Sequence, residues 1–145
     1  MRWILRIGYG SILFVLALGA IALYQGVTTS IRAENTLHAT LLVVDLTKQY
    51  VTTNDGAWPD SWDDLEKVSP PESSAGTYDW PADSAKIQQC VEVDFDADPK
   101  RIALQAPEEF DAVLPIGPYY PYQDYGSVRA LIEAVAAHHE GESTP

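Results

Sequence analysis

The sequence predicts an α+β protein with one N-terminal transmembrane helix and a small domain. In that domain a long helix packs on a short antiparallel sheet, and a C-terminal helix follows. Three observations predict this: an uncharged stretch between Arg6 and Arg32, a helical spacing of apolar residues after it, and an alternating run over 87–95. The 145 residues suffice for the anchor plus one domain of about 100 residues.

The N-terminal segment predicts contact with a lipid bilayer through residues 7–24. Ile7–Tyr24 is apolar, and its 18 residues would rise about 27 Å as a helix, which matches a hydrocarbon core. Arg2 and Arg6 precede it, so the N-terminus is expected in the cytoplasm and the C-terminal domain outside the cell membrane. The predicted parts are an anchor over 1–27, an acidic extracytoplasmic domain over 28–140 and a flexible tail over 141–145.

A cleaved signal peptide is the alternative, with cleavage near Ala22. Ala20 and Ala22 supply the small residues that a cleavage site needs. The apolar run is longer than the usual 7–15 residues of a signal peptide and continues through that site, so we favour an uncleaved anchor. The cleaved form would be secreted, and both alternatives place the domain outside the cytoplasm.

The charge of the chain excludes nucleic acid as a partner. All 21 Asp and Glu residues follow Arg32, against seven Lys and Arg from Arg32 onward, which gives that part a net charge of about −14. Phosphate contacts need clustered Lys and Arg. We interpret the acidic surface as a solvated face that keeps the domain soluble, with an acidic recognition face as the alternative. Cys90 is the only cysteine, so an internal disulfide is excluded.

Apolar spacing predicts the helices of the domain. A helix is expected over 31–51, with a buried strand over 41–44 as the alternative, and Asn54-Asp55-Gly56 ends it. Ser61 and Asp64 predict a short helix over 61–68, and 69–83 reads as a loop. Ser127 is expected to cap the last helix. The inward-facing residues of that helix should be Val128, Leu131, Ile132 and Val135.

Alternation predicts the strands. Residues 87–95 are expected to form a half-buried strand, 96–100 a turn and 101–105 a second strand that pairs with the first. Residues 110–116 are expected to add a third, shorter strand. Residues 117–126 form a loop rich in Tyr and Pro.

No catalytic, cofactor or metal site is predicted. Asp94, Asp96 and Asp98 begin like a calcium loop, but Pro99 stands where that loop needs Gly and Gln105 where it needs Glu. His138 and His139 are adjacent on a helix and do not converge on one metal, and His38 is isolated. The chain has no recognisable nucleophile motif, and acids beside Cys90 blunt that thiol. A non-enzyme without cofactors is expected.

The Tyr/Pro loop is the candidate protein-interaction surface, with Tyr119, Tyr120, Tyr122 and Tyr125. Alternatively, these rings cover the core beside the last helix. The expected function is that of a non-enzymatic envelope protein, anchored by a single pass, with another envelope protein as its partner. Two alternatives stay open: a sensor domain that binds a small ligand or cation, and a membrane-tethered hydrolase.

The order of the parts resembles type IV pilins and the pseudopilins of type II secretion. Asp55-Gly56-Ala57-Trp58-Pro59, followed by Asp64-Leu65, looks like the turn that often follows the long helix in that family. The resemblance implies a pilin-like soluble module. The processing signature is missing, since Gly8-Tyr9 or Gly10-Ser11 would be the junction and no Glu precedes Glu34. The resemblance therefore does not extend to processing or polymerisation.

Overall fold

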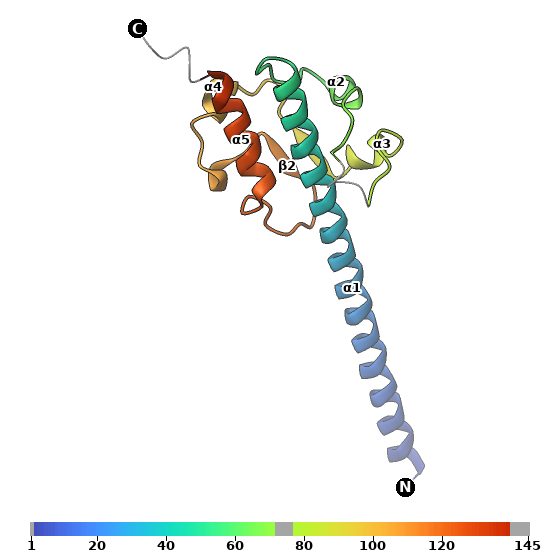
Figure 1. The fold of residues 1–145 in the computed structure, drawn as a ribbon. Coiled ribbons are helices and arrows are strands. Elements are labelled where there is room, and N and C mark those ends of the chain that lie inside the picture. The colour runs from blue at the N-terminus through green and yellow to red at the C-terminus, as the bar shows by residue number, and fades with distance from the viewer. Residues whose placement is uncertain (1, 72–76, 140–145) are drawn as a thin grey trace. The chain divides into compact units, whose positions relative to one another are not determined.

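The computed structural model describes residues 2–71 and 77–139, with side chains from residue 16 onward. The chain is mostly helical, with one small sheet (Figure 1). Its elements in order are α1 (Arg2–Thr53), α2 (Trp62–Glu66), α3 (Ser84–Ile87), β1 (Val91–Val93), α4 (Pro99–Ile102), a 3-10 turn (Pro107–Glu109), β2 (Val113–Pro115) and α5 (Gly126–His139).

The chain divides into two compact units, Met1–Arg32 and Ala33–Pro145. The boundary falls inside α1, although the sequence predicted an anchor over 1–27 and a separate helix over 31–51. The hydroxyl residues between these two predicted parts fit inside the continuous helix, since a hydroxyl side chain can bond to the helix's own backbone. Thr28 Oγ1 lies 3.0 Å from the carbonyl oxygens of both Tyr24 and Gln25.

The predicted transmembrane helix is wrong. Within the part of the chain that the structure describes, no helix is both long enough and apolar enough to cross a membrane. From Leu16 onward the uncharged stretch also contains Gly19, Gln25, Gly26 and three hydroxyl residues. These lower its mean hydropathy below that of a run of Leu, Ile and Val. The prediction rested on the apolar run over 7–24, of which residues 7–15 lie outside the part whose side chains the structure describes.

The C-terminal part of α1 supplies the centre of the second unit's core. The helix predicted over 31–51 is confirmed, and the alternative strand over 41–44 is wrong. Val43, Val44, Leu46 and Val51 have no exposed surface. Two threonines share this face without cost, since Thr40 and Thr47 donate to helix carbonyls four residues earlier at 2.8 Å.

Asp55 and Gly56 end α1 as predicted. Both have positive φ angles, 51° and 84°, and the Gly56 N–H donates to Val51 O at 3.0 Å. The last turn of α5 packs on this turn. A Cβ on Gly56 would lie 2.5 Å from His138 Cβ, and a His139 ring nitrogen lies 3.2 Å from Gly56 O. Figure 1 shows the ends of α1 and α5 side by side. Glycine is therefore required here both for its φ and for the close approach.

The sheet has two strands instead of three. β1 and β2 are antiparallel, and Glu92 pairs with Leu114. Val91 and Val93 are buried and Glu92 is exposed, so the alternation predicted for 87–95 holds over three residues. Ile87 belongs to α3 instead. The strand predicted over 110–116 is β2, which pairs directly with β1.

Residues 101–105 are not a strand. Pro99–Ile102 form α4, in which Pro99 takes the first helical turn and the Asp98 carboxylate accepts the Lys100 N–H at 2.9 Å. A capping Asp followed by Pro favours a helix start over a hairpin turn. The side chain that reaches the core from this helix is Ile102, which has no exposed surface.

The C-terminal helix is confirmed, but it begins at Gly126, so Ser127 lies inside the helix and is not the cap that the sequence predicted. Its buried residues are Val128, Leu131, Ile132 and Val135, the four that the spacing predicted. The helix predicted over 61–68 is also present, although shorter, as α2. Ser61 is the N-cap residue, but its side chain makes no capping bond to the helix backbone, so the predicted capping box is only half formed. The Asp64 carboxylate accepts the Asp60 N–H at 3.2 Å and the Ser61 hydroxyl at 3.4 Å.

Candidate protein-interaction surface

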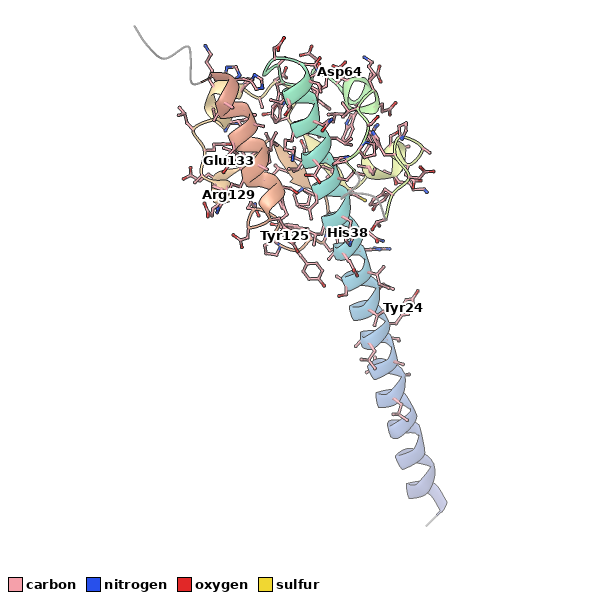
Figure 2. All side chains as sticks on the ribbon, in the orientation of Figure 1. Tyr24, His38, Asp64, Tyr125, Arg129 and Glu133 are labelled. Carbon is pink, nitrogen blue, oxygen red and sulfur yellow. The ribbon has the colours of Figure 1, made fainter. Side chains whose placement is uncertain are left out.

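The four tyrosines of the predicted surface divide into three exposed rings and one buried ring. Tyr119, Tyr120 and Tyr125 are 52%, 43% and 45% exposed, whereas Tyr122 is 1% exposed. Figure 2 labels Tyr125, which immediately precedes α5. A buried ring offers a partner no contact area, so the candidate surface keeps Tyr119, Tyr120 and Tyr125 and loses Tyr122. The alternative, that these rings cover the core, applies to Tyr122.

Tyr122 fixes the loop to β2. Its hydroxyl donates to Val113 O at 2.6 Å. Burial raises the pKa of Tyr122 to about 12, because the phenolate would lose its hydration. The hydrogen bonds between β1 and β2 involve the residues on either side of Val113 and not Val113 itself. The Asp94 N–H donates to Ala112 O at 2.9 Å, and the Ile116 N–H donates to Cys90 O at 2.7 Å. The Val113 carbonyl therefore points away from β1 and can accept the Tyr122 hydroxyl. Tyr122 is thus an anchor that positions the exposed tyrosines.

The outward face of β2 adds aliphatic surface next to these rings in the chain. Leu114 and Ile116 point to the same face of the sheet because they are two residues apart, and they are 40% and 45% exposed. We call Leu114, Ile116, Tyr119, Tyr120 and Tyr125 together the tyrosine–aliphatic surface. Sequence reasoning missed its aliphatic half, since the strand's register was needed to tell which residues face outward.

An acidic groove of about 420 Å³ lies on the same face of the sheet. Its lining residues are Glu92, Val93, Asp94, Phe95, Asp96, Asp111 and Leu114. The first five come from β1 and the turn after it, and the last two come from β2 and the residues before it. Leu114 belongs to both the groove and the tyrosine–aliphatic surface. The groove is therefore a mixed site of carboxylates and apolar side chains.

Two tryptophans hold the β1 side of the groove. Trp58 Nε1 donates to Asp94 O at 2.9 Å, and the Trp62 and Phe95 rings meet edge to face with centroids 5.8 Å apart. Asp94 Oδ1 accepts the Asp96 N–H at 3.1 Å. The sequence that begins like a calcium loop therefore forms a local turn here. Asp94 and Asp96 shape this turn and Asp98 caps α4, as expected for acids at a solvated strand end.

Asp111 lines the other side of the groove, and its negative charge is compensated by neighbouring side chains. Arg101 Nη1 lies 3.0 Å from Asp111 Oδ2, and Gln105 Nε2 lies 3.0 Å from Asp111 Oδ1. The hydrogen bond from Arg101, together with that from Gln105, lowers the pKa of Asp111. The groove's negative character comes mainly from Glu92, Asp94 and Asp96.

A second groove, of about 410 Å³, lies between the end of α1 and α2. Its polar side chains stabilise the fold around them. Asn54 Nδ2 donates to Tyr50 O at 2.8 Å, and Lys67 Nζ lies 2.9 Å from Asp64 Oδ1. The hydrogen bond from Lys67 lowers the pKa of Asp64, and desolvation raises the pKa of Tyr50. These contacts suit helix ends better than ligand recognition.

The histidines and the cysteine lie apart. His38 Nε2 is 3.9 Å from Glu34 Oε1 on α1, and His139 contacts Gly56. Over residues 2–71 and 77–139, no three His, Cys, Asp or Glu side chains come together in a way that could hold a metal ion. Cys90 is half-buried, and the register places it two residues from Glu92 on the outward face.

The first unit carries a further exposed apolar face on α1. Leu16, Leu23, Val27 and Ile31 follow the spacing of one helix face and are 52–73% exposed. Exposed apolar residues are ordinary when single, but a row of them is typical of a contact surface. The sequence had predicted that part of this segment contacts lipid.

Comparison of the chain with protein-family models, with curated proteins and with solved structures finds no match. The resemblance to pilins stays a prediction from the sequence. So do the cell-membrane localisation, the contact with lipid, the secreted alternative and the exclusion of nucleic acid. The sensor and hydrolase alternatives are likewise untested.

Proposed function

We propose that this chain is a protein-binding module whose contact area is the tyrosine–aliphatic surface. The observation that supports it is the concentration of five large apolar side chains, each 40–52% exposed, within residues 114–125. A folded domain buries such side chains when it has room, so several exposed ones within one short segment favour an interaction site. Tyrosine gives a large contact area at a low entropy cost, and its hydroxyl tolerates water before binding.

The buried part of the same loop supports the proposal. Because Tyr122 anchors the loop through Val113, the exposed rings start from a fixed position. A surface that is already ordered loses less conformational entropy when a partner binds. The exposed tyrosines therefore resemble a prepared contact surface more than a loose loop.

A photo-crosslinking amino acid at position 119 tests the proposal in cells that make the protein. The control places it at Glu133, which is exposed on α5 and labelled in Figure 2. A protein adduct is expected from position 119 and not from 133.

The captured protein is then purified and titrated by calorimetry. Tyr119→Ser combined with Tyr125→Ser should weaken its binding at least about tenfold, since buried aromatic contacts dominate interface energies. Glu133→Gln should leave the affinity unchanged. Equal adducts from both positions, or an unchanged affinity of the tyrosine variant, would refute the proposal.

A further inference from the structure

The outward face of the sheet has the chemistry of a docking site for a chain segment. Leu114 lies exposed opposite Glu92 across the two strands, and Val93 and Phe95 contribute apolar lining to the same groove. A partner that covers this face removes Leu114 from water. An apolar side chain in the partner is the natural contact for it.

Charge complementarity determines what else the partner must carry. Glu92, Asp94 and Asp96 line one side of the groove, and Arg101 already pairs with Asp111 on the other side. The whole chain has a formal net charge of −12, which adds to the local field. Lys or Arg side chains are attracted to such a groove, whereas nucleic acid and anionic lipid are repelled.

The groove is also prepared before binding. Trp58 and Trp62 hold the backbone and ring of residues 94–95, so the carboxylates are presented from a fixed turn. Leu114 links the groove to the tyrosine–aliphatic surface. One partner can therefore contact both areas, with a basic segment in the groove and an apolar surface against the tyrosines.

We propose that the acidic groove binds an extended segment of the partner protein in which Lys or Arg residues flank an aliphatic residue. This inference rests on the proposed function, since it names the chemistry of the partner. Basic side chains pair with Glu92, Asp94 and Asp96, and the aliphatic residue packs on Leu114 and Phe95.

A short peptide tests the groove separately from the tyrosines. The probe is fluorescein-labelled Lys-Leu-Lys-Val-Lys, with Glu-Leu-Glu-Val-Glu as the reversed-charge control, and binding to the full chain is followed by fluorescence anisotropy. The groove variant is Glu92→Gln, Asp94→Asn and Asp96→Asn. The matched variant removes the same charge elsewhere, with Glu108→Gln, Glu109→Gln and Glu133→Gln, all exposed and outside the groove.

The groove variant should bind the basic peptide about tenfold more weakly, because three partly exposed ion pairs are lost. The matched variant should stay within about twofold of the unmodified chain, since only long-range attraction falls. Leu114→Ala should also weaken the binding, and the acidic peptide should not bind. Asn at position 94 keeps an oxygen for the Asp96 N–H, so the turn survives, and equal melting temperatures of the two triple variants verify this.

Three results would overturn the inference. Equal weakening in both triple variants would mean that the peptide senses net charge alone. Heat from a CaCl₂ titration that disappears in the groove variant would make the groove a cation site. Self-association that is lost in the groove variant would assign the face to a second copy of the chain. Tyr119→Ser with Tyr125→Ser separates the proposals: it should weaken partner binding at least about tenfold yet leave the peptide affinity within about twofold.

Discussion

Replacing Tyr122 with phenylalanine removes one buried hydroxyl and leaves the ring in place. The hydroxyl donates to Val113 O at 2.6 Å, and the side chain is 1% exposed. Without it the Val113 carbonyl loses this partner inside the protein. We expect the free energy of unfolding at pH 7 to fall by about 1–2 kcal/mol, the usual cost of removing one member of a buried hydrogen bond.

The same substitution should change how stability depends on alkaline pH. Burial raises the pKa of Tyr122 to about 12, against about 10 in the unfolded chain. The proton therefore stabilises the folded state fully below pH 10, and this contribution is lost as the pH rises toward 12. Stability should fall by about 1.4 kcal/mol per pH unit in that window through this residue alone. Phenylalanine has no proton to lose. At pH 11 the difference between the two proteins should shrink by about 1.4 kcal/mol and approach zero.

Urea denaturation at pH 7 and pH 11, followed by tryptophan fluorescence, measures both effects. Trp58 and Trp80 are buried in the second unit and report its unfolding. Titration of other groups affects both proteins equally and cancels in the difference. Tyr125→Phe is the control, because that side chain is 45% exposed. A loss below about 0.5 kcal/mol at pH 7, or a difference that stays constant to pH 11, would refute the reasoning.

Three further predictions test the structure by urea denaturation. Gly56→Ala should lower the free energy of unfolding by about 2–4 kcal/mol, because it combines the strain of a positive φ with a Cβ only 2.5 Å from His138 Cβ. Gly117→Ala has the same kind of strain without the clash and should cost about 1 kcal/mol. Equal losses would contradict the contact between Gly56 and His138. Asp64, Asp83 and Asp111 have lowered pKa values, because each accepts a hydrogen bond from a basic side chain. The ionised carboxylates therefore stabilise the fold fully above about pH 4, and this contribution is lost as the pH falls further. The unmodified chain should lose more stability between pH 6 and pH 3 than a variant with Asn at all three positions. Trp58→Phe removes the donor to Asp94 O and should cost about 1 kcal/mol at pH 7 as well as weaken the basic peptide, whereas an unchanged peptide affinity would show that the tryptophan does not shape the groove.

The helices of the domain were predictable where one face repeats regularly. Val128, Leu131, Ile132 and Val135 repeat at helical spacing, and all four are buried. The end of α1 was also predictable, because a Gly after an apolar helix commonly adopts the positive φ that ends the helix. Residues 101–105 were mistaken for a strand because a short apolar run fits either period. The signal that decides it was present in the capping Asp98 and the following Pro99.

The groove was beyond the sequence because it depends on strand register. The prediction paired residues 87–95 with 101–105, but β1 pairs with β2, about 20 residues further along the chain. Only that pairing brings Asp111 and Leu114 beside Glu92 and Asp94. Likewise, four tyrosines of similar local sequence differ in burial, and it is the Tyr122 hydroxyl that reaches the Val113 carbonyl. Local composition contains no information about which of them it is.

The outer edge of β2 is a poor template for another β-strand. Its Val113 carbonyl is occupied by the Tyr122 hydroxyl, and Pro115 has no N–H to offer. An added strand would therefore lose two of the bonds that pairing along this edge requires. Two-stranded sheets otherwise offer such edges as templates for aggregation, so Tyr122 and Pro115 together reduce that risk along β2. A partner at this edge is therefore better recognised through side chains than by strand addition.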